Sequence, residues 1–136
     1  MAAVPLALLR LWAPVVALMA TIFSLSSIPD IPITEPLAVS GHSVGYLALA
    51  VLVVRALAGG LPRRIDLRIA VTALVVTVAY AVSDEFHQWF VPGREASVVD
   101  VVTDAIGALA GTIACWAWGI ISRVSGPVRG PSRDEL

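Results

Sequence analysis

Residues 83–111 read SDEFHQWFVPGREASVVDVVTDAIGALAG, and this stretch decides the fold because it places many ionisable side chains between two apolar segments. A charged side chain in the hydrocarbon of a bilayer costs roughly 2.5 to 3.5 kcal/mol on insertion scales. Several such side chains in one segment therefore need internal partners, access to water, or a function. The stretch is the first place to look for a site.

The composition places the chain among integral membrane proteins. Hydrophobic residues make up 58% of its 136 residues, charged residues only 14%, and the mean hydropathy is +0.88, far outside ordinary soluble usage. About 20 apolar residues are needed for each transmembrane helix, so the length allows one domain of four spans. Hydropathy predicts an all-α, four-helix membrane bundle over residues 1–121, followed by a disordered tail over 122–136. The spans are expected at about 6–28, 42–58, 68–90 and 98–121.

The placement of arginine predicts the orientation, because short cytoplasmic loops retain basic residues. All nine basic residues are arginine. One group flanks the second connection or follows the last span: Arg55, Arg63, Arg64, Arg68, Arg123, Arg129 and Arg133. Only Arg94 falls on the opposite side of the membrane from this group. Both termini are therefore expected on the cytoplasmic side of a bacterial cell membrane, and the polar residues are expected at its extracytoplasmic rim. A net charge of −1 without a basic stripe excludes a nucleic-acid partner.

Helical spacing groups the polar residues of the third span. Asp84, His87 and Gln88 fall at i, i+3 and i+4 and so share one face, while Glu85 lies about 100° away. Asp84 and His87 are expected to meet. Arg94 follows a proline and a glycine in a tight turn, and we expect its guanidinium to be the counter-ion of the third-span carboxylates or to bind a lipid phosphate.

The fourth and second spans combine small residues with ionisable groups. Asp100 and Asp104 share a face of the fourth span with a GxxxG pair, Gly107 and Gly111, which permits close approach of a second helix. In the second span His42 lies between Gly41 and Gly45, with Tyr46 four residues later. The pattern predicts that three helices close around a polar pocket.

Ser97 has the position of an N-cap for the fourth helix, with Asp100 three residues later in an arrangement similar to a capping box. Such a cap competes with any catalytic role for Asp100. His42, Glu85, His87 and Asp100 are residue types that suit zinc, yet no spacing like HExxH supports a site, so no metal or other cofactor is expected.

The stretch DEFHQWFVPGREASVVDVVTDAIGALAG resembles the core motif of the VanZ-like membrane proteins, a family of small multi-span proteins linked to resistance against the lipoglycopeptide antibiotic teicoplanin. The motif positions are occupied by Glu85, His87, Gln88, Pro92, Gly93, Arg94, Asp100, Gly107 and Gly111. Further support comes from the histidine and tyrosine of the second span and from the serines that end the first, Ser24, Ser26 and Ser27. The resemblance extends over most of the chain and implies an association with envelope stress.

Three residues in two places depart from the family pattern. Many members carry an Asp-Lys pair just before the second-span histidine, where this chain has Ala38 and Val39, and an asparagine is usual in the fourth span, where it has Asp104. The Asp104 carboxylate is expected either to replace an amide hydrogen bond near His87 or Arg94, or to carry a proton in an apolar setting.

Three functions remain open. The favoured hypothesis is an accessory envelope protein that binds a membrane lipid or a lipid-linked envelope component at the rim, without turnover, and so modulates sensitivity to lipoglycopeptides. A second is a membrane enzyme acting on a lipid-linked phosphate or amide, with Glu85 or His87 as general base and Arg94 stabilising an anionic transition state. A third is a lipid transporter, for which four spans would require a homo-oligomer.

The candidate site residues divide into two groups. The candidates for a catalytic role are Glu85, His87, Arg94 and Asp100. The candidates for a binding role are His42, Tyr46, Asp84, Gln88 and Asp104.

Overall fold

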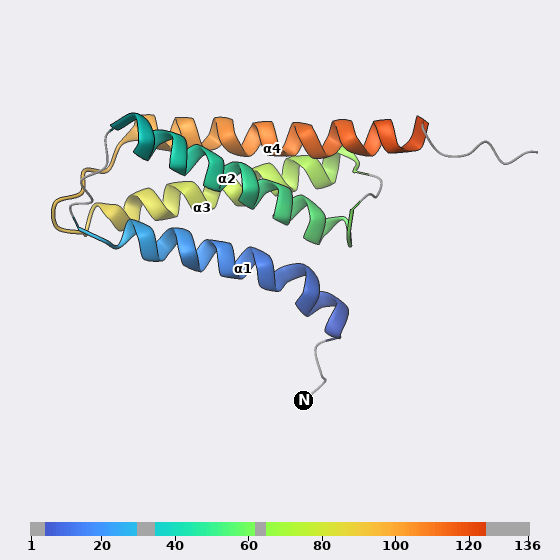
Figure 1. The fold of residues 1–136 in the computed structure, drawn as a ribbon, viewed down its shortest axis with the longest axis horizontal. Coiled ribbons are helices and arrows are strands. Elements are labelled where there is room, and N and C mark those ends of the chain that lie inside the picture. Colours follow the sequence, from blue (N-terminus) through green and yellow to red (C-terminus); the bar gives the residue numbers. More distant parts are fainter. Residues whose placement is uncertain (1–4, 30–34, 62–64, 125–136) are drawn as a thin grey trace, which may run out of the picture.

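A computed structural model describes residues 5–29, 35–61 and 65–124 of the protein. These residues form four helices, α1 (Leu6–Ser26), α2 (Glu35–Leu57), α3 (Leu67–Gln88) and α4 (Val98–Val124). Successive helices run in opposite directions, so the start of α1 and the end of α4 lie at the same end of the bundle (Figure 1). The predicted all-α, four-helix architecture is confirmed.

Three of the helices are long and apolar enough to cross a bilayer, namely Leu6–Ser26, Leu67–Gln88 and Val98–Ile121. At 1.5 Å per residue the 21 residues of α1 extend over about 32 Å, close to the roughly 30 Å of bilayer hydrocarbon. The apolar part of α2 found among the described residues is shorter, Gly41–Leu57. The prediction of a membrane span is therefore supported for α1, α3 and α4, and for α2 it stays a prediction.

The helix boundaries differ from the expected ones mainly in α2 and α4. Helix α2 begins at Glu35 instead of near residue 42, and Pro36 falls in its first turn, where a missing amide hydrogen breaks no helical bond. Helix α4 continues to Val124, so the first residues expected in the tail are helical. The rest of that expected tail lies outside the described residues. Helix α3 begins after Asp66, whose carboxylate accepts the Ile69 amide at 2.8 Å as an N-cap.

The tightest packing in the bundle joins α2 and α4, as the GxxxG pair of α4 predicts. Gly107 and Gly111 are buried, and a Cβ built on Gly111 would lie 2.5 Å from the carbonyl oxygen of Leu47. A Cβ on Gly107 would overlap the carbonyl of Ser43 even more severely. The parallel expectation for α2 is wrong at Gly41, which has nothing within 4 Å of its Cβ position. Among the described glycines of α2 and α4, Gly107 and Gly111 are the ones that bring two helix backbones together.

Helix α1 lies on the outside of the bundle, against α2 and more lightly against α3, and diverges from them toward its start (Figure 1). Its buried side chains are few, with Val15 and Ile22 facing the core around Tyr46, Leu49 and Val53. Large apolar side chains on all four helices are exposed, as expected where lipid is the solvent.

Candidate functional site

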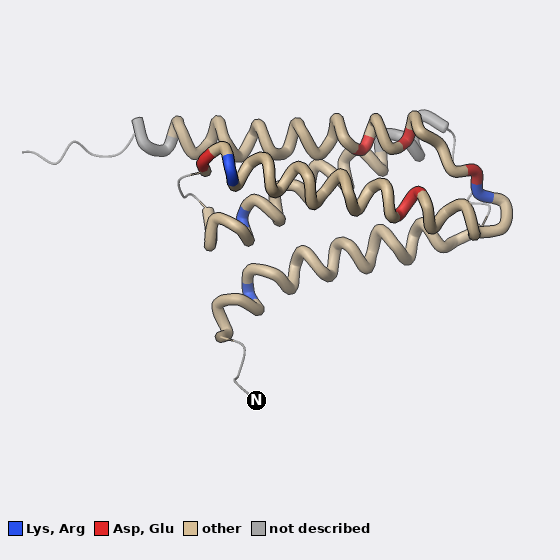
Figure 2. The backbone as a smooth tube through the Cα atoms, turned by 180° about the vertical axis from the view of Figure 1, so that it is seen from behind, with Lys and Arg blue, Asp and Glu red and all other residues tan. Residues whose placement is uncertain are grey.

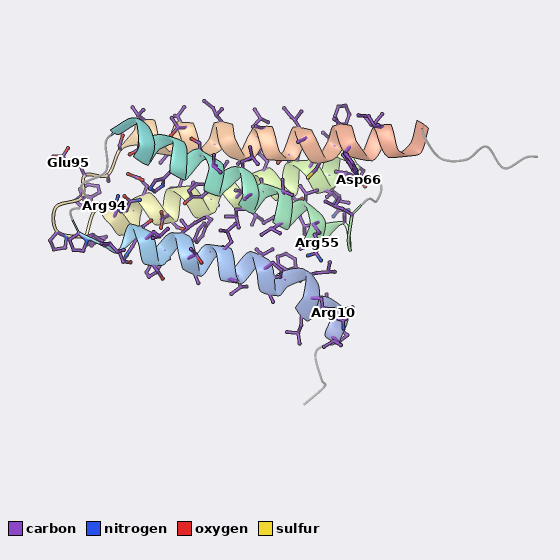
Figure 3. All side chains as sticks on the ribbon, in the orientation of Figure 1. Arg10, Arg55, Asp66, Arg94 and Glu95 are labelled. Atoms are coloured by element: carbon purple, nitrogen blue, oxygen red, sulfur yellow. The ribbon has the colours of Figure 1, made fainter. Side chains whose placement is uncertain are left out.

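Acidic residues gather at one end of the bundle, where α1 and α3 finish and α2 and α4 begin (Figure 2). We call this the polar end. Arg94 and Glu95 lie in its connecting loop, whereas Arg10, Arg55 and Asp66 lie at the opposite end (Figure 3). In the described part of the chain, the candidate residues are therefore separated from Arg10 and Arg55 by the length of the bundle.

Three carboxylates at the polar end are buried. Asp84 and Glu85 of α3 are 3% and 6% exposed, and Asp104 of α4 is 2% exposed. An ionised carboxylate in such a place is costly unless hydrogen bonds or an opposite charge compensate it. Each of the three has a different set of neighbours.

Asp84 joins α1 to α3 through one of its two oxygens. Its Oδ2 accepts the hydroxyl of Ser26 at 2.6 Å and the amide of Gln88 at 3.3 Å. This contact agrees with the predicted shared face of Asp84 and Gln88, whereas the expectation that Asp84 and His87 meet is wrong. His87 shares the face but directs its Nε2 to Ser27 instead of to Asp84.

Glu85 holds the start of α4. Its Oε1 accepts the backbone amide of Ser97 at 2.6 Å, and its Oε2 accepts Gln88 Nε2 at 3.3 Å. The Ser97 hydroxyl accepts the amide of Val99 at 3.2 Å, so the predicted N-cap is confirmed. The reciprocal bond to the Ser97 amide comes from Glu85, and the expectation that Asp100 supplies it is wrong. A residue of the preceding helix completes the capping box.

Arg94 was expected to pair with the third-span carboxylates, and this expectation is wrong. Its Nη2 donates to the carbonyl of Leu25 at 3.0 Å and its Nε to the carbonyl of Ile28 at 3.3 Å. Leu25 lies in the last turn of α1 and Ile28 follows the C-cap residue Ser27, so both carbonyls belong to the end of the helix, where acceptors outnumber backbone donors. A cation is also favoured there by the helix dipole. Arg94 is therefore a C-terminal cap of α1.

His87 and the end of α1 form a compact group. His87 Nε2 lies 3.0 Å from Ser27 Oγ, and the imidazole ring stacks on Phe23 with a centroid separation of 4.3 Å and an interplanar angle of 28°. Ser27 Oγ also lies 2.7 Å from the Phe23 carbonyl. Histidine, serine and phenylalanine thus fix one another across α1 and α3.

Asp104 faces α2 rather than His87 or Arg94. Asp104 Oδ2 is 3.9 Å from His42 Nδ1. The His42 side chain is 27% exposed, so it connects this buried carboxylate with the surface. Tyr46 is 1% exposed one turn further along α2, near the carboxylates of Asp84 and Asp104. Side chains of α2, α3 and α4 that were expected to line a pocket therefore lie at the polar end, and the pocket itself stays a prediction.

Three buried oxygens at the polar end make no hydrogen bond of ordinary length and angle to any described residue: Tyr46 Oη, Asp84 Oδ1 and Asp104 Oδ1. Each comes from a different helix. Tyr46 and Asp84 nevertheless lie close enough to interact with each other. A buried polar atom without a partner costs about 1–3 kcal/mol, so such atoms in a native fold indicate a place for a bound water or ligand. Among the described residues no three histidine, cysteine, aspartate or glutamate side chains come close enough to hold a metal ion.

With this geometry in view, a model of the VanZ/LLP1 family matches residues 4–121. The chain belongs to the VanZ/LLP1 family. Searches of the curated proteins and of the solved structures found no match. The family and the three apolar helices together indicate that this VanZ/LLP1 protein is a multi-pass membrane protein.

Sequence reasoning missed the parts of the site that α1 contributes. Ser26 and Ser27 were noted only for their resemblance to the VanZ-like pattern, yet they bind Asp84 and His87. The signal that could have found them is topological. In an up-and-down bundle the first and third spans end at the same side, so polar residues that end both spans are expected to meet.

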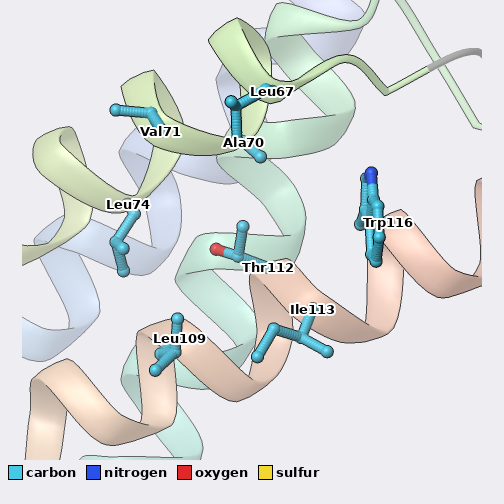
Figure 4. Close-up of a pocket in the computed structure, with 8 residues that line it drawn as sticks. All are labelled: Leu67, Ala70, Val71, Leu74, Leu109, Thr112, Ile113 and Trp116. Carbon is cyan, nitrogen blue, oxygen red and sulfur yellow. The ribbon is translucent and has the colours of Figure 1, made fainter.

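An apolar groove lies in the half of this VanZ/LLP1 bundle away from the candidate residues. It has a volume of about 250 Å³ and opens between α3 and α4 (Figure 4), lined by Leu67, Ala70, Val71, Leu74, Leu109, Thr112, Ile113 and Trp116. The hydroxyl of Thr112 is turned back to the Ala108 carbonyl at 2.9 Å. The lining therefore suits a hydrocarbon chain and offers no reactive group.

Proposed function

We propose that this VanZ/LLP1 protein acts at the bacterial cell envelope, where it binds a lipid or a lipid-linked component at the polar end and so modulates sensitivity to lipoglycopeptide antibiotics. The observation that carries the proposal is the group of unpartnered buried oxygens of Tyr46, Asp84 and Asp104. Packing alone gives no reason to keep such atoms inside a membrane protein, because apolar side chains would fill the space without the desolvation cost.

The charge of the pocket supports a particular kind of ligand group. Asp84, Glu85 and Asp104 are buried together, the chain contains no lysine, and Arg94 is bound to carbonyls of α1. A ligand with an ammonium or amide group would supply the donors that Asp84 Oδ1 and Asp104 Oδ1 lack. His42, partly exposed beside Asp104, marks the side from which such a group would enter.

The distribution of arginine supports an extracytoplasmic polar end. Arg10 and Arg55 lie at the opposite end of the bundle (Figure 3), where short cytoplasmic connections retain basic residues. An extracytoplasmic polar end would meet envelope precursors and amphiphilic antibiotics before they reach the cytoplasm. Both chain termini would then be cytoplasmic.

The proposal is tested by measuring the teicoplanin susceptibility of cells that express the wild type or Asp84→Asn at matched membrane levels. Vancomycin, which lacks the lipid tail, is the control antibiotic. Asp84→Asn keeps the shape of the side chain and an acceptor for Ser26, but removes the charge. We expect selective protection against teicoplanin by the wild type and at least a fourfold loss of that protection in the variant.

Glu95→Gln is the matched control, since it removes one carboxylate from an exposed position at the same end of the bundle. It should protect as the wild type does. Equal protection by Asp84→Asn and wild type would remove the carboxylate pocket from the function, and no protection by the wild type would refute the envelope role in that host.

A further inference from the structure

The contact between Ser27 and His87 has the geometry of a nucleophile and its general base. Ser27 Oγ and His87 Nε2 are 3.0 Å apart, within the 2.6–3.2 Å in which a base can take a hydroxyl proton. Both side chains are half-buried and so remain accessible at the polar end. Stacking on Phe23 fixes the imidazole plane. The pair comes from two helices, α1 and α3, separated by 60 residues of sequence.

The hydroxyl of Ser27 has one proton and two neighbours that can accept it. If the Ser27 hydroxyl donates its proton to the Phe23 carbonyl at 2.7 Å, His87 Nε2 must be the donor to Ser27 Oγ. If the hydroxyl instead donates to His87 Nε2, the histidine can act as a base and activate the serine. A proton on Nδ1 of His87 selects the second arrangement. Rotation about one serine torsion therefore converts a helix-end serine into a nucleophile.

The depth of Ser27 in the bilayer selects the bond that it would attack. It directly follows the 21 residues of α1, whose length of about 32 Å matches the hydrocarbon thickness. Ser27 is thus expected at the boundary between acyl chains and headgroups, where the ester carbonyls of membrane lipids lie. Lipid phosphates lie further out, so an acyl ester fits this position better than a phosphodiester.

Arg94 provides positive charge at the end of α1, where Ser27 is the C-cap residue. It binds the carbonyls of Leu25 and Ile28, the residues on either side of the Ser26–Ser27 pair. Two of the five guanidinium N–H groups make these bonds, which leaves donors for an anion that forms beside Ser27. A fixed cation at this place stabilises the negative oxygen of a tetrahedral intermediate.

We propose that Ser27 and His87 form a catalytic dyad that hydrolyses an acyl ester of a membrane lipid. Ser27 Oγ bonds to the ester carbonyl carbon as its proton passes to His87 Nε2, and that proton then goes to the leaving alcohol as the ester C–O bond breaks. Water, losing a proton to His87, attacks the acyl-serine carbonyl; the fatty acid leaves and Ser27 regains the proton.

The test is covalent labelling of the purified full chain in detergent by a fluorescent fluorophosphonate, which forms a bond from serine Oγ to phosphorus and releases fluoride. We expect one labelled site, mapped to Ser27 by peptide mass, and no label in Ser27→Ala. His87→Gln should be labelled at least about 100-fold more slowly, the lower range of general-base contributions. The same protein in phosphatidylglycerol vesicles should release fatty acid in proportion to active Ser27.

Ser24→Ala is the matched control, because Ser24 Oγ makes the same contact to the carbonyl four residues earlier, at 2.7 Å from Ala20, and is an exposed serine of the same helix. It should be labelled as the wild type is. An unlabelled wild type, undiminished labelling of Ser27→Ala, or wild type that releases no fatty acid would each overturn the proposal. No antibiotic or growing cell is involved, so these failures are distinct from a failure of the proposed envelope function.

A thiol version guards against a Ser27→Ala variant that fails to fold. In a Cys115→Ala background, Ser27→Cys should react with iodoacetamide at least about 10-fold faster than Ser24→Cys near neutral pH, since a neighbouring histidine promotes the thiolate. The advantage should disappear with His87→Gln. Equal rates for the two thiols would show that His87 does not activate position 27.

Discussion

Helix α4 packs against α2 through Gly107 and Gly111, whose nearest neighbours are main-chain carbonyls, whereas α1 reaches α3 through hydrogen bonds made by side chains. The first interface depends on shape and tolerates no added atom. The second depends on a few directional bonds that can be lost one at a time. The comparison indicates that α2 and α4 form the rigid part of the bundle and that α1 is the helix whose position polar chemistry controls.

The strongest test of the rigid interface is Gly107→Ala. The added methyl group would overlap the Ser43 carbonyl, and overpacking of this kind costs about 1–3 kcal/mol, here expected near 3 because backbone atoms cannot rotate away. Reversible unfolding in mixed micelles measures the loss. Gly41→Ala, with nothing within 4 Å of the new atom, is the matched control and should not destabilise. Equal stability of the two variants would contradict the tight contact.

The bond that fixes the start of α4 is tested by Glu85→Ala. It leaves the Ser97 amide without its acceptor at 2.6 Å, and a lost partner for a partly buried donor costs about 1–3 kcal/mol, so we expect about 2 kcal/mol. The same unfolding measurement applies. Glu95→Ala removes an exposed carboxylate from the same loop and should change stability by less than about 0.5 kcal/mol. If Glu85→Ala left the free energy of unfolding unchanged, the bond from Glu85 to the Ser97 amide would not stabilise the start of α4.

The polar interface of α1 is tested by Ser26→Ala, which removes the 2.6 Å bond to Asp84. Polar contacts between membrane helices contribute about 0.6 kcal/mol on average and up to about 1.7, and this buried, charged example should lie near the upper value. Amide hydrogen exchange should show α1 opening while α4 keeps its protection. Ser24→Ala, which loses only a contact within α1, should leave exchange unchanged.

The smallest expected effect belongs to Tyr80→Phe. The Tyr80 hydroxyl donates to the Met19 carbonyl at 2.6 Å, an acceptor that already belongs to a helix, so the loss should be about 0.6 kcal/mol. Exchange should increase only around the middle of α1. If α4 loosened to the same extent, the division of the bundle into a rigid pair and a separately held helix would be wrong.

The sequence predicted contacts best where spacing within one helix decides them. The shared face of Asp84 and Gln88, the N-cap at Ser97 and the close approach at Gly107 all follow from local patterns that need no knowledge of the partner. The family and the number of helices were also accessible, because composition and motif determine them.

The sequence could not predict which partner a polar group selects across the bundle. Arg94 was expected to pair with a carboxylate because opposite charges attract, but it binds carbonyls at the end of α1, where the helix dipole favours a cation. Asp104 was expected near His87 or Arg94 and lies near His42 instead. Such choices depend on helix rotation and tilt, which a hydropathy pattern leaves open.

The contact of Arg94 with α1 determines when the bundle can close during synthesis. Its acceptors, Leu25 and Ile28, precede it by 69 and 66 residues. At a synthesis rate of roughly 5–20 residues per second, α1 exists for about 3–14 s before the ribosome adds Arg94, which binds the end of the helix. Arg94 therefore binds the end of α1 only after α2 and α3 have been made, and until then the terminal carbonyls of α1 need water or headgroups as temporary partners.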